Sequence, residues 1–209
     1  MPPHDAPSAH RPSAAVTING LPVAAGDHIC AFYRGSAEFD ELVVPFLDEG
    51  VRAGDKCICI TGRAHHGRLV AALGGRSTVE RGQLLVEDYD ATYLRSGSFT
   101  GERMLEYWVD WGRTTFEAER WPFARGATDM SWAGEMGSEP MLDDFLNYEL
   151  QATLIARMYP QVALCLYDLD LFGGNVIIPV LKVHPKVLFR GTLLENPYYL
   201  VPDAGRGVG

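Results

Sequence analysis

The stretch Asp27–Gly54, DHICAFYRGSAEFDELVVPFLDEGVRAG, predicts a strand, a tight loop and a helix in succession. Residues 28–33 carry no acid, lysine or arginine and are apolar on both alternating faces, which is typical of a strand inside a parallel sheet. The turn Arg34-Gly35-Ser36 ends this strand, and Ser36 is placed to cap the helix. The buried face of that helix is predicted to hold Phe39, Leu42, Val43, Phe46 and Leu47.

Either Gly50 or Gly54 is expected to end this helix, and the apolar run 56–60, KCICI, then begins a second strand. The stretch is therefore one β-α-β unit with a glycine-containing loop at the carboxyl end of its first strand. Ligands of such folds bind at this place.

The loop after the first strand stands where a phosphate loop would stand but lacks its chemistry. A Walker A loop needs a second glycine, a lysine for the phosphate charge and a hydroxyl for Mg²⁺. Residues 33–41, YRGSAEFDE, have neither that glycine nor the lysine, and Glu38, Asp40 and Glu41 would repel a polyphosphate. The sequence predicts a nucleotide-fold scaffold without nucleotide hydrolysis, and no enzyme.

Composition limits the class of protein. The chain has 209 residues, 47% hydrophobic and 22% charged, which suits one globular α/β domain. A net charge of −9 with no visible basic patch argues against nucleic acid as a direct partner. No apolar run is long enough for a membrane span or a signal core, so we expect a cytoplasmic location. The four cysteines fall in predicted strands, as reduced buried thiols do.

Further strands and helices alternate along the rest of the chain. Predicted strands are 83–88, 123–128, 162–167 and 186–189, with a last strand or hairpin arm at 191–195 and a short strand or hairpin arm at 16–21 that turns at Asn19-Gly20. Predicted helices are 65–73, 100–119, 139–158 (capped by Ser138) and 176–181. This order predicts an α/β fold with a mostly parallel, doubly wound sheet. Residues 1–15 are expected to be a disordered tail, 16–202 a single domain and 203–209 a flexible end.

Eight short motifs occur in an order that resembles one known family. They are His28 with Tyr33, FL-x-x-G-x-x-x-G-x-KC from Phe46 to Cys57, Gly82-Gln83-Leu84, Arg125 with Asp129-Met130-Ser131-Trp132, Tyr148-Glu149, Ala163-Leu164-Cys165 with Tyr167-Asp168, His184-Pro185 and Asn196-Pro197-Tyr198-Tyr199. The chain resembles the MEDS domain, the sensory domain of methanogens and methylotrophs. The resemblance implies a RecA/KaiC-like core that has lost its Walker A loop, and a sensory role with small organic molecules as signals. It also implies a neighbouring kinase, anti-sigma-factor or DNA-binding module.

Glu149 is the most informative single residue. It falls on the apolar face of the predicted helix 139–158, and burying a carboxylate is costly unless it is paired. One interpretation is a structural salt bridge, with Arg125 as the expected partner. The other is a contact with a ligand or a metal ion.

A second set of candidates lies at the ends of strands. Arg125, Asp129 and Trp132 combine a cation, an anion and a large ring, which suits recognition of a small molecule but also a self-contained loop. Asp168 ends an apolar strand as a Walker B aspartate does, although without a phosphate-loop lysine we expect a loop cap or a ligand contact. The predicted ligand-binding residues are Tyr33, Arg34, Arg125, Asp129, Trp132, Glu149, Asp168 and His184.

No metal or other cofactor is expected from the sequence. The adjacent His65 and His66 would point apart on a helix. Cys57 and Cys59 are interpreted as small core residues, since a metal or redox pair would need Cys30 or Cys165 across the sheet. His28 is interpreted as structural and Cys165, in mid-strand, as inert.

Three functions remain open at this point. The leading hypothesis is a sensory or regulatory domain whose partners are a small organic molecule and a regulatory protein, with no membrane and self-association left open. The alternatives are a residual nucleotide binder that depends on Asp168, and a ligand-free interaction module with an exposed apolar patch around Trp108 or Trp111.

Overall fold

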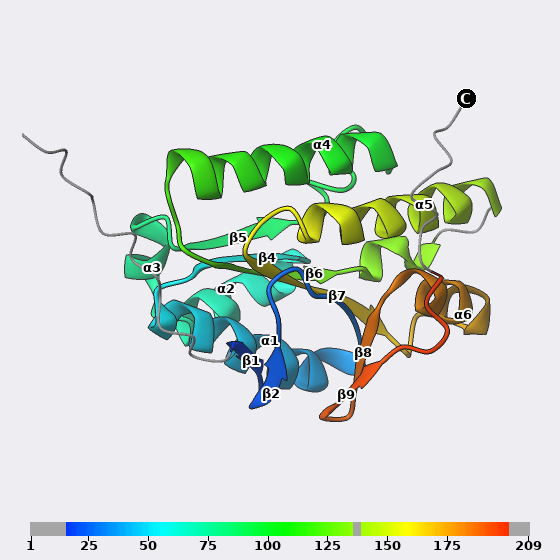
Figure 1. Cartoon of the computed structure of the whole chain (residues 1–209), viewed down its shortest axis with the longest axis horizontal. Helices are drawn as coiled ribbons and strands as arrows, with labels where there is room; N and C mark the ends of the chain where they lie inside the picture. The colour runs from blue at the N-terminus through cyan, green and yellow to red at the C-terminus, as the bar shows by residue number, and fades with distance from the viewer. Residues whose placement is uncertain (1–15, 136–138, 201–209) are drawn as a thin grey trace, which may run out of the picture.

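The computed structural model describes residues 16–135 and 139–200, and its centre is a seven-stranded sheet (Figure 1). Six strands are parallel, and only the edge strand β9 is antiparallel to its neighbour. In spatial order the strands are β5 (Leu84–Asp88), β4 (Lys56–Thr61), β6 (Ala124–Asp129), β7 (Gln161–Asp168), β3 (His28–Tyr33), β8 (Lys186–Phe189) and β9 (Thr192–Glu195). The mostly parallel α/β fold predicted from the sequence is confirmed.

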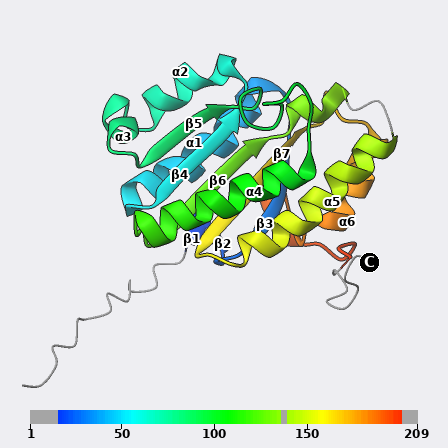
Figure 2. The same ribbon diagram turned by 90° about the horizontal axis from the view of Figure 1, so that it is seen from above.

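Helices cover both faces of the sheet (Figures 1 and 2). One face carries α1 (Gly35–Ala53) and α2 (Arg63–Ala72), and the other carries α4 (Gly101–Gly112) and α5 (Glu139–Ala156), which lie side by side in Figure 2. The short α3 (Arg76–Glu80) leads into β5, and α6 (Gly174–Val183) packs beside α5. The small hairpin of β1 (Val16–Ile18) and β2 (Leu21–Val23) turns at Asn19-Gly20, as predicted.

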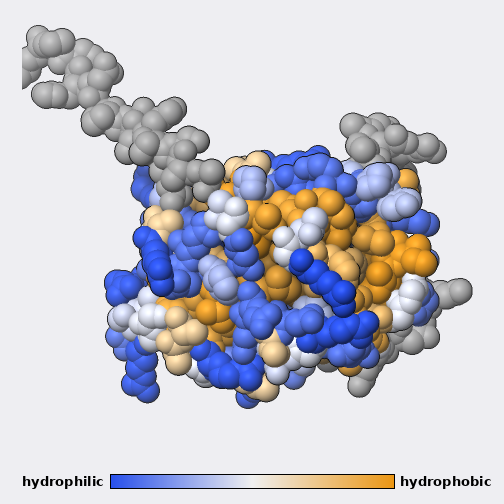
Figure 3. Space-filling view, turned by 90° about the horizontal axis from the view of Figure 1, so that it is seen from below, coloured by the Kyte–Doolittle hydropathy of each residue, from blue (hydrophilic) through white to orange (hydrophobic). Residues whose placement is uncertain are grey.

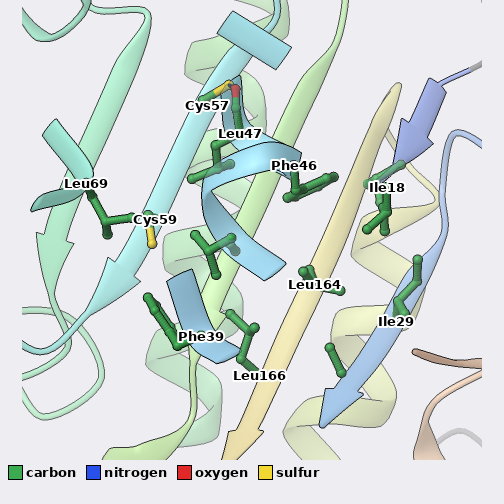
Figure 4. Packing of buried hydrophobic residues seen from close by; sticks show 14 of the residues in the cluster. Ile18, Ile29, Phe39, Phe46, Leu47, Cys57, Cys59, Leu69, Leu164 and Leu166 are labelled. Atoms are coloured by element: carbon green, nitrogen blue, oxygen red, sulfur yellow. Dashed lines mark hydrogen bonds between the residues drawn. The ribbon is translucent and has the colours of Figure 1, made fainter. Parts of the chain in front are cut away.

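The alternation of side chains along the strands divides the core into two halves. Ile29, Leu164 and Leu166 face α1 and α2, where they pack with Phe39 and Phe46 (Figure 4). On the other face Cys30, Phe32, Cys165 and Tyr167 pack with residues of α4, α5 and α6. This period of two assigns each strand residue to one of the two helix layers.

The first helix departs from the sequence-based expectation at its N-terminal end and ends at one of the two predicted glycines. Its N-cap is Arg34, and no side chain caps it, so the predicted Ser36 cap is wrong. The Glu38 carboxylate instead accepts a hydrogen bond from the Arg34 amide at 2.8 Å. The helix runs through Gly50 and ends at Gly54, whose φ of 79° is the left-handed conformation that favours glycine.

The predicted helix 100–119 is two elements. After α4 the chain continues as the π-helical turn η1 (Arg113–Ala118). At the junction, a Cβ on Gly112 would lie 2.3 Å from Cε2 of Tyr159, whose ring stacks on Phe116. Glycine at this position therefore lets the end of α4 approach Tyr159 closely.

Some predictions fall on residues that the structure does not describe. The tail 1–15, the Ser138 cap and the end 203–209 are outside the described ranges, and the domain boundaries stay a prediction. Across the part that is described, we find no helix long and apolar enough to cross a membrane. The molecule still exposes apolar groups on the face that carries α1, β2 and β9, where orange patches interrupt the polar surface (Figure 3).

Candidate functional site

Four side chains of types that can bind metal ions, each from a different part of the chain, meet between α5 and the sheet. They are His28 at the start of β3, Glu149 in the middle of α5, Cys165 on β7 and His184 at the end of α6. All four are buried, and one donor atom from each lies within 4.8 Å of the others. The shortest separations are 3.1 Å from His184 Nε2 to Glu149 Oε2, 3.4 Å from His28 Nε2 to the same oxygen, and 3.1 Å from His28 Nε2 to Cys165 Sγ.

The fold brings these residues together through strand pairing and helix periodicity. β3 and β7 are hydrogen-bonded neighbours in which Cys30 pairs with Cys165, so His28 lies two residues away on the same face. On α5, Glu149 and Thr153 are four residues apart and point to the same side. His184 follows α6 directly and precedes Pro185, which cannot donate a backbone hydrogen bond to continue the helix.

Hydrogen bonds fix the orientation of both imidazoles. Nδ1 of His184 lies 2.9 Å from the carbonyl oxygen of Val180. A carbonyl only accepts, so this nitrogen carries the proton and Nε2 of the neutral ring is a bare lone pair. Nδ1 of His28 lies 2.8 Å from Oγ1 of Thr153, whose hydroxyl is within reach of the carbonyls of Glu149 and Val183. Both Nε2 atoms therefore face the carboxylate.

The carboxylate of Glu149 is ionised but poorly satisfied. Burial by itself raises its pKa, but the adjacent His184 and His28 imidazoles, when they are protonated, outweigh this effect and lower the pKa to about 2. Burial lowers the pKa of His28 and raises the pKa of the Cys165 thiol. Among the described residues, neither oxygen of Glu149 has a partner with hydrogen-bond geometry, and neither does Nε2 of His184. A buried group in this condition needs an explanation.

A small cavity adjoins this cluster under α4 and α5. Its volume is about 40 Å³, and its wall includes His28 and Cys165. On the helix side, α4 contributes two tryptophan rings and α5 contributes one tyrosine and three aliphatic residues. The sheet side includes small residues of β6 and β7, with Gly126 paired to Ala163. The lining residues are His28, Tyr93, Trp108, Trp111, Gly126, Thr128, Tyr148, Ala152, Ile155, Ala156, Gln161, Val162, Ala163 and Cys165.

The expected ion pair between Glu149 and Arg125 is wrong. Arg125 points to the opposite face of the sheet, where Nε donates to Asp55 at 3.0 Å. Its terminal nitrogen donates to the carbonyls of Thr17 and Phe46 at 2.9 and 3.1 Å. The buried guanidinium therefore holds together the hairpin β1–β2, α1 and the residue that precedes β4, which is a structural role.

Tyr33 and Asp129 do meet at the carboxyl ends of β3 and β6. The Tyr33 hydroxyl donates to one oxygen of Asp129 at 3.2 Å, and Thr61 donates to the other at 3.0 Å. The amide and hydroxyl of Ser131 also donate to Asp129, at 2.9 and 2.5 Å. These bonds satisfy the carboxylate from within the chain and order the loop after β6.

The other candidates at the strand ends have separate roles. Arg34 is paired with Asp170 at the surface. The Asp168 carboxylate accepts a hydrogen bond from the Asp170 amide at 2.9 Å. Asp168 therefore caps the turn after β7, which is one of the two roles expected for it. Trp132 is buried in an aromatic cluster, with its ring centre 4.8 Å from that of Tyr93. None of the eight predicted ligand residues is among the described residues that line the cavity. The structure therefore brings Glu149 to His184, and it brings Tyr33 to Asp129 and, through the pairing of β3 with β7, to Asp168.

Sequence reasoning missed His28 and Cys165 as functional residues. Considered separately, His28 is expected to be structural and Cys165 to be inert. A signal was present, because His28 is a polar residue in an otherwise apolar strand and alternates in phase with Cys30. Its partners are 121 to 156 residues away in the chain (149 − 28 and 184 − 28), so no local pattern connects them.

Comparisons with known proteins agree with this architecture. A flagellar accessory protein, FlaH from Methanocaldococcus jannaschii, has a similar fold, with a TM-score of 0.55 and 11% identity over 90% of this chain and 85% of that one. The transcriptional repressor DcmR of Methylorubrum extorquens is 27% identical over 186 residues, 86% of this chain. The aligned part is 66% of the repressor's own length.

The model of one family matches residues 27–185, which is most of the chain and includes all four residues of the buried cluster. That family is described as the methanogen/methylotroph DcmR sensory domain. The chain belongs to the MEDS family of sensory domains.

Proposed function

We propose that this protein senses a small organic molecule, which binds in the cavity beneath α4 and α5 and changes how a regulatory partner is engaged. The cavity carries the proposal, because its surface is mainly apolar, includes four aromatic rings and holds few polar groups, as ligand sites do. Membership in a family of sensory domains and likeness to a transcriptional repressor support a regulatory role.

The size of the cavity limits the ligand. A volume of about 40 Å³ is about three times the roughly 10–15 Å³ of cavity space that is needed to hold one water molecule. The occupant is therefore a molecule of a few heavy atoms, such as a one- or two-carbon compound. A larger ligand would have to move α4 or α5 away from the sheet.

The wall chemistry favours a mainly apolar occupant with one polar contact. Trp108 and Trp111 contribute ring faces. The Trp108 indole N–H donates to the Tyr148 hydroxyl at 2.8 Å, which lies 3.0 Å from the Tyr93 hydroxyl. These groups satisfy one another, so the lining offers few free donors or acceptors to a strongly polar ligand.

The position of the cavity provides a route to a partner. It lies between the sheet and the two helices that form one outer layer of the molecule (Figure 2). A ligand that fills it favours the arrangement of α4 and α5 that closes around it, and a partner that contacts these helices responds to the difference. The partner we propose is a regulatory protein.

Signalling without catalysis is part of the same proposal. The Arg34 amide before α1 is bonded to the Glu38 carboxylate, and the Arg34 guanidinium is paired with Asp170, which favours a site that does not bind or hydrolyse a phosphate. Burial raises the pKa of the Cys30, Cys57, Cys59 and Cys165 thiols, which opposes nucleophilic chemistry.

Tryptophan fluorescence tests this proposal directly, because Trp108 and Trp111 line the cavity. The protein would be titrated with methanol, ethanol, dichloromethane and acetonitrile, and thermal unfolding would be followed in parallel. A binder should quench or shift the emission and raise the melting temperature, and Trp111→Phe should reduce the emission change. Trp121→Phe is the matched control, since Trp121 lies outside the lining. A response that is lost equally in both variants, or seen with every compound, would contradict binding in this cavity.

A further inference from the structure

The buried cluster of His28, Glu149, Cys165 and His184 is not explained by binding of an organic molecule. Only His28 and Cys165 reach the cavity wall. Glu149 and His184 are completely buried behind it, and their facing atoms have no hydrogen-bond partner in the described chain. An uncompensated buried carboxylate costs several kilocalories per mole, so a protein retains one only with a compensating group.

We propose that these four side chains bind one divalent transition-metal ion, with Zn²⁺ as the best match. His28 and His184 would supply Nε2, Cys165 its thiolate and Glu149 one carboxylate oxygen. This site goes beyond the proposed sensing of a small molecule and does not depend on it.

The orientation of the two imidazoles favours a bound cation. The carbonyl of Val180 holds the proton of His184 on Nδ1, so the lone pair of Nε2 lies 3.1 Å from Glu149 Oε2. Two lone pairs at that distance repel each other unless a proton or a metal ion lies between them. Metal-binding histidines are held in this way, with the second ring nitrogen bonded to a carbonyl or another oxygen, and Thr153 is placed to do the same for His28.

The spacing of the donor atoms is close to that around a tetrahedral zinc ion. Tetrahedral zinc has bonds of about 2.0 Å to nitrogen and oxygen and about 2.3 Å to sulfur, which places neighbouring N and O donors roughly 3.3 Å apart and N and S donors roughly 3.6 Å apart. The separations are 3.1 and 3.4 Å for N to O and 3.1 Å for N to S. Three of the six donor separations therefore lie within about 0.5 Å of those in a tetrahedral shell, and the others are within 4.8 Å, so side-chain adjustments would close the four donors around one ion.

The geometry disfavours the alternative, which is a buried ion pair between Glu149 and a protonated histidine. Such a pair is stable when the proton lies on the line between nitrogen and oxygen. Nε2 of His184 is close to Oε2 but makes no hydrogen bond in the described structure, so its ring is directed beside the carboxylate rather than at it. In a metal shell each donor is directed at the common centre instead of at its neighbour.

The donor set also selects the class of ion. Two imidazoles, one sulfur and one carboxylate suit zinc, iron(II) or cobalt(II), whereas calcium and magnesium take oxygen ligands. All four positions of a tetrahedral shell are supplied by the protein. A shell with four protein ligands and no open position is the arrangement of a structural zinc site, which adds to folding stability.

The test is metal analysis of the full chain, by native mass spectrometry and elemental analysis after expression in zinc-supplemented medium. We expect one Zn²⁺ per chain. Replacement with Co²⁺ should give visible bands of tetrahedral cobalt and a thiolate-to-cobalt charge-transfer band in the near ultraviolet. Cys165→Ser should remove the charge-transfer band, while Cys59→Ser, on the opposite face of the sheet and buried to the same degree, should keep it.

His184→Asn is the matched test of a nitrogen ligand, since the asparagine amide can still donate to the Val180 carbonyl while Nε2 is lost. Zn²⁺ affinity should fall by more than about a hundredfold, and His66→Asn should leave it unchanged. Wild-type protein that takes up no Zn²⁺ and gives no cobalt charge-transfer band would overturn the proposal, as would a folded His184→Asn variant of wild-type affinity. The wild-type measurements decide the question even if a variant fails to fold.

Discussion

Filling the cavity under α4 and α5 should stabilise the protein and at the same time abolish its response to a ligand. Ala163 lines the cavity from the central strand β7, and it remains partly exposed although its strand is in the middle of the sheet. Ala163→Val adds two methyl groups at this place. Because an internal void of about 40 Å³ costs roughly 24 cal/mol per Å³, removing it is worth about 1 kcal/mol.

Urea denaturation measures this change. We expect the unfolding free energy of Ala163→Val to rise by about 1 kcal/mol with an unchanged slope, which corresponds to a melting temperature higher by roughly 2–4 °C. Compounds that stabilise the wild type should no longer do so. Ala127→Val is the matched control, because Ala127 is fully buried on the other face, where an added methyl group overpacks the core at a cost of about 1–3 kcal/mol.

Two results would refute this reasoning. If Ala163→Val destabilises the protein as much as Ala127→Val, the space beside Ala163 does not exist. If Ala163→Val is more stable but responds to ligands like the wild type, the cavity is real but is not the binding site.

Three further perturbations test other parts of the structure. Asp55→Asn removes the carboxylate that pairs with the buried Arg125, and urea denaturation should show a loss of about 3–5 kcal/mol; a loss below 1 kcal/mol would contradict a structural ion pair. Gly112→Ala would place a methyl carbon 2.3 Å from the Tyr159 ring, so thermal unfolding should show destabilisation of about 1–3 kcal/mol. Gly67→Ala, whose new methyl group meets no described heavy atom within 4 Å, should instead stabilise by about 0.5–1 kcal/mol, and equal effects at both glycines would refute the packing argument. Removal of metal with a chelator should lower the melting temperature, and Zn²⁺ but not Mg²⁺ should restore it; an unchanged melting temperature in a protein that had carried zinc would show that the ion is not bound at a folding site.

The candidate site could be predicted only in part. Glu149 was identified correctly as a buried carboxylate that needs a partner, because the helical period places it on the apolar face of α5. Its partner was misassigned to Arg125, since periodicity tells which face of an element is buried but not which face of the sheet an element covers. Arg125 lies on the α1 face with Asp55, and Glu149 lies over the other face with two histidines.

Local pattern was sufficient for the elements themselves. The uncharged run 28–33, the amphipathic helix after it and the glycine at 54 depend on neighbours within a few residues, and all three have the predicted structure. The prediction of the helix cap is wrong because α1 begins at Gly35, which places Ser36 inside the first turn, and the Glu38 side chain accepts the hydrogen bond of the Arg34 amide.

Only the tertiary structure decided the chemistry of the interior. Placing β3 between β7 and β8, with α5 above it and the end of α6 beside it, brings His28 to Cys165, Glu149 and His184. Pairing of parallel strands is set by contacts between residues far apart in the chain, so nothing within one strand encodes its neighbour. The sequence by itself determined the strands, the helices and the family, and long-range packing determined the cluster of donors and the cavity beside it.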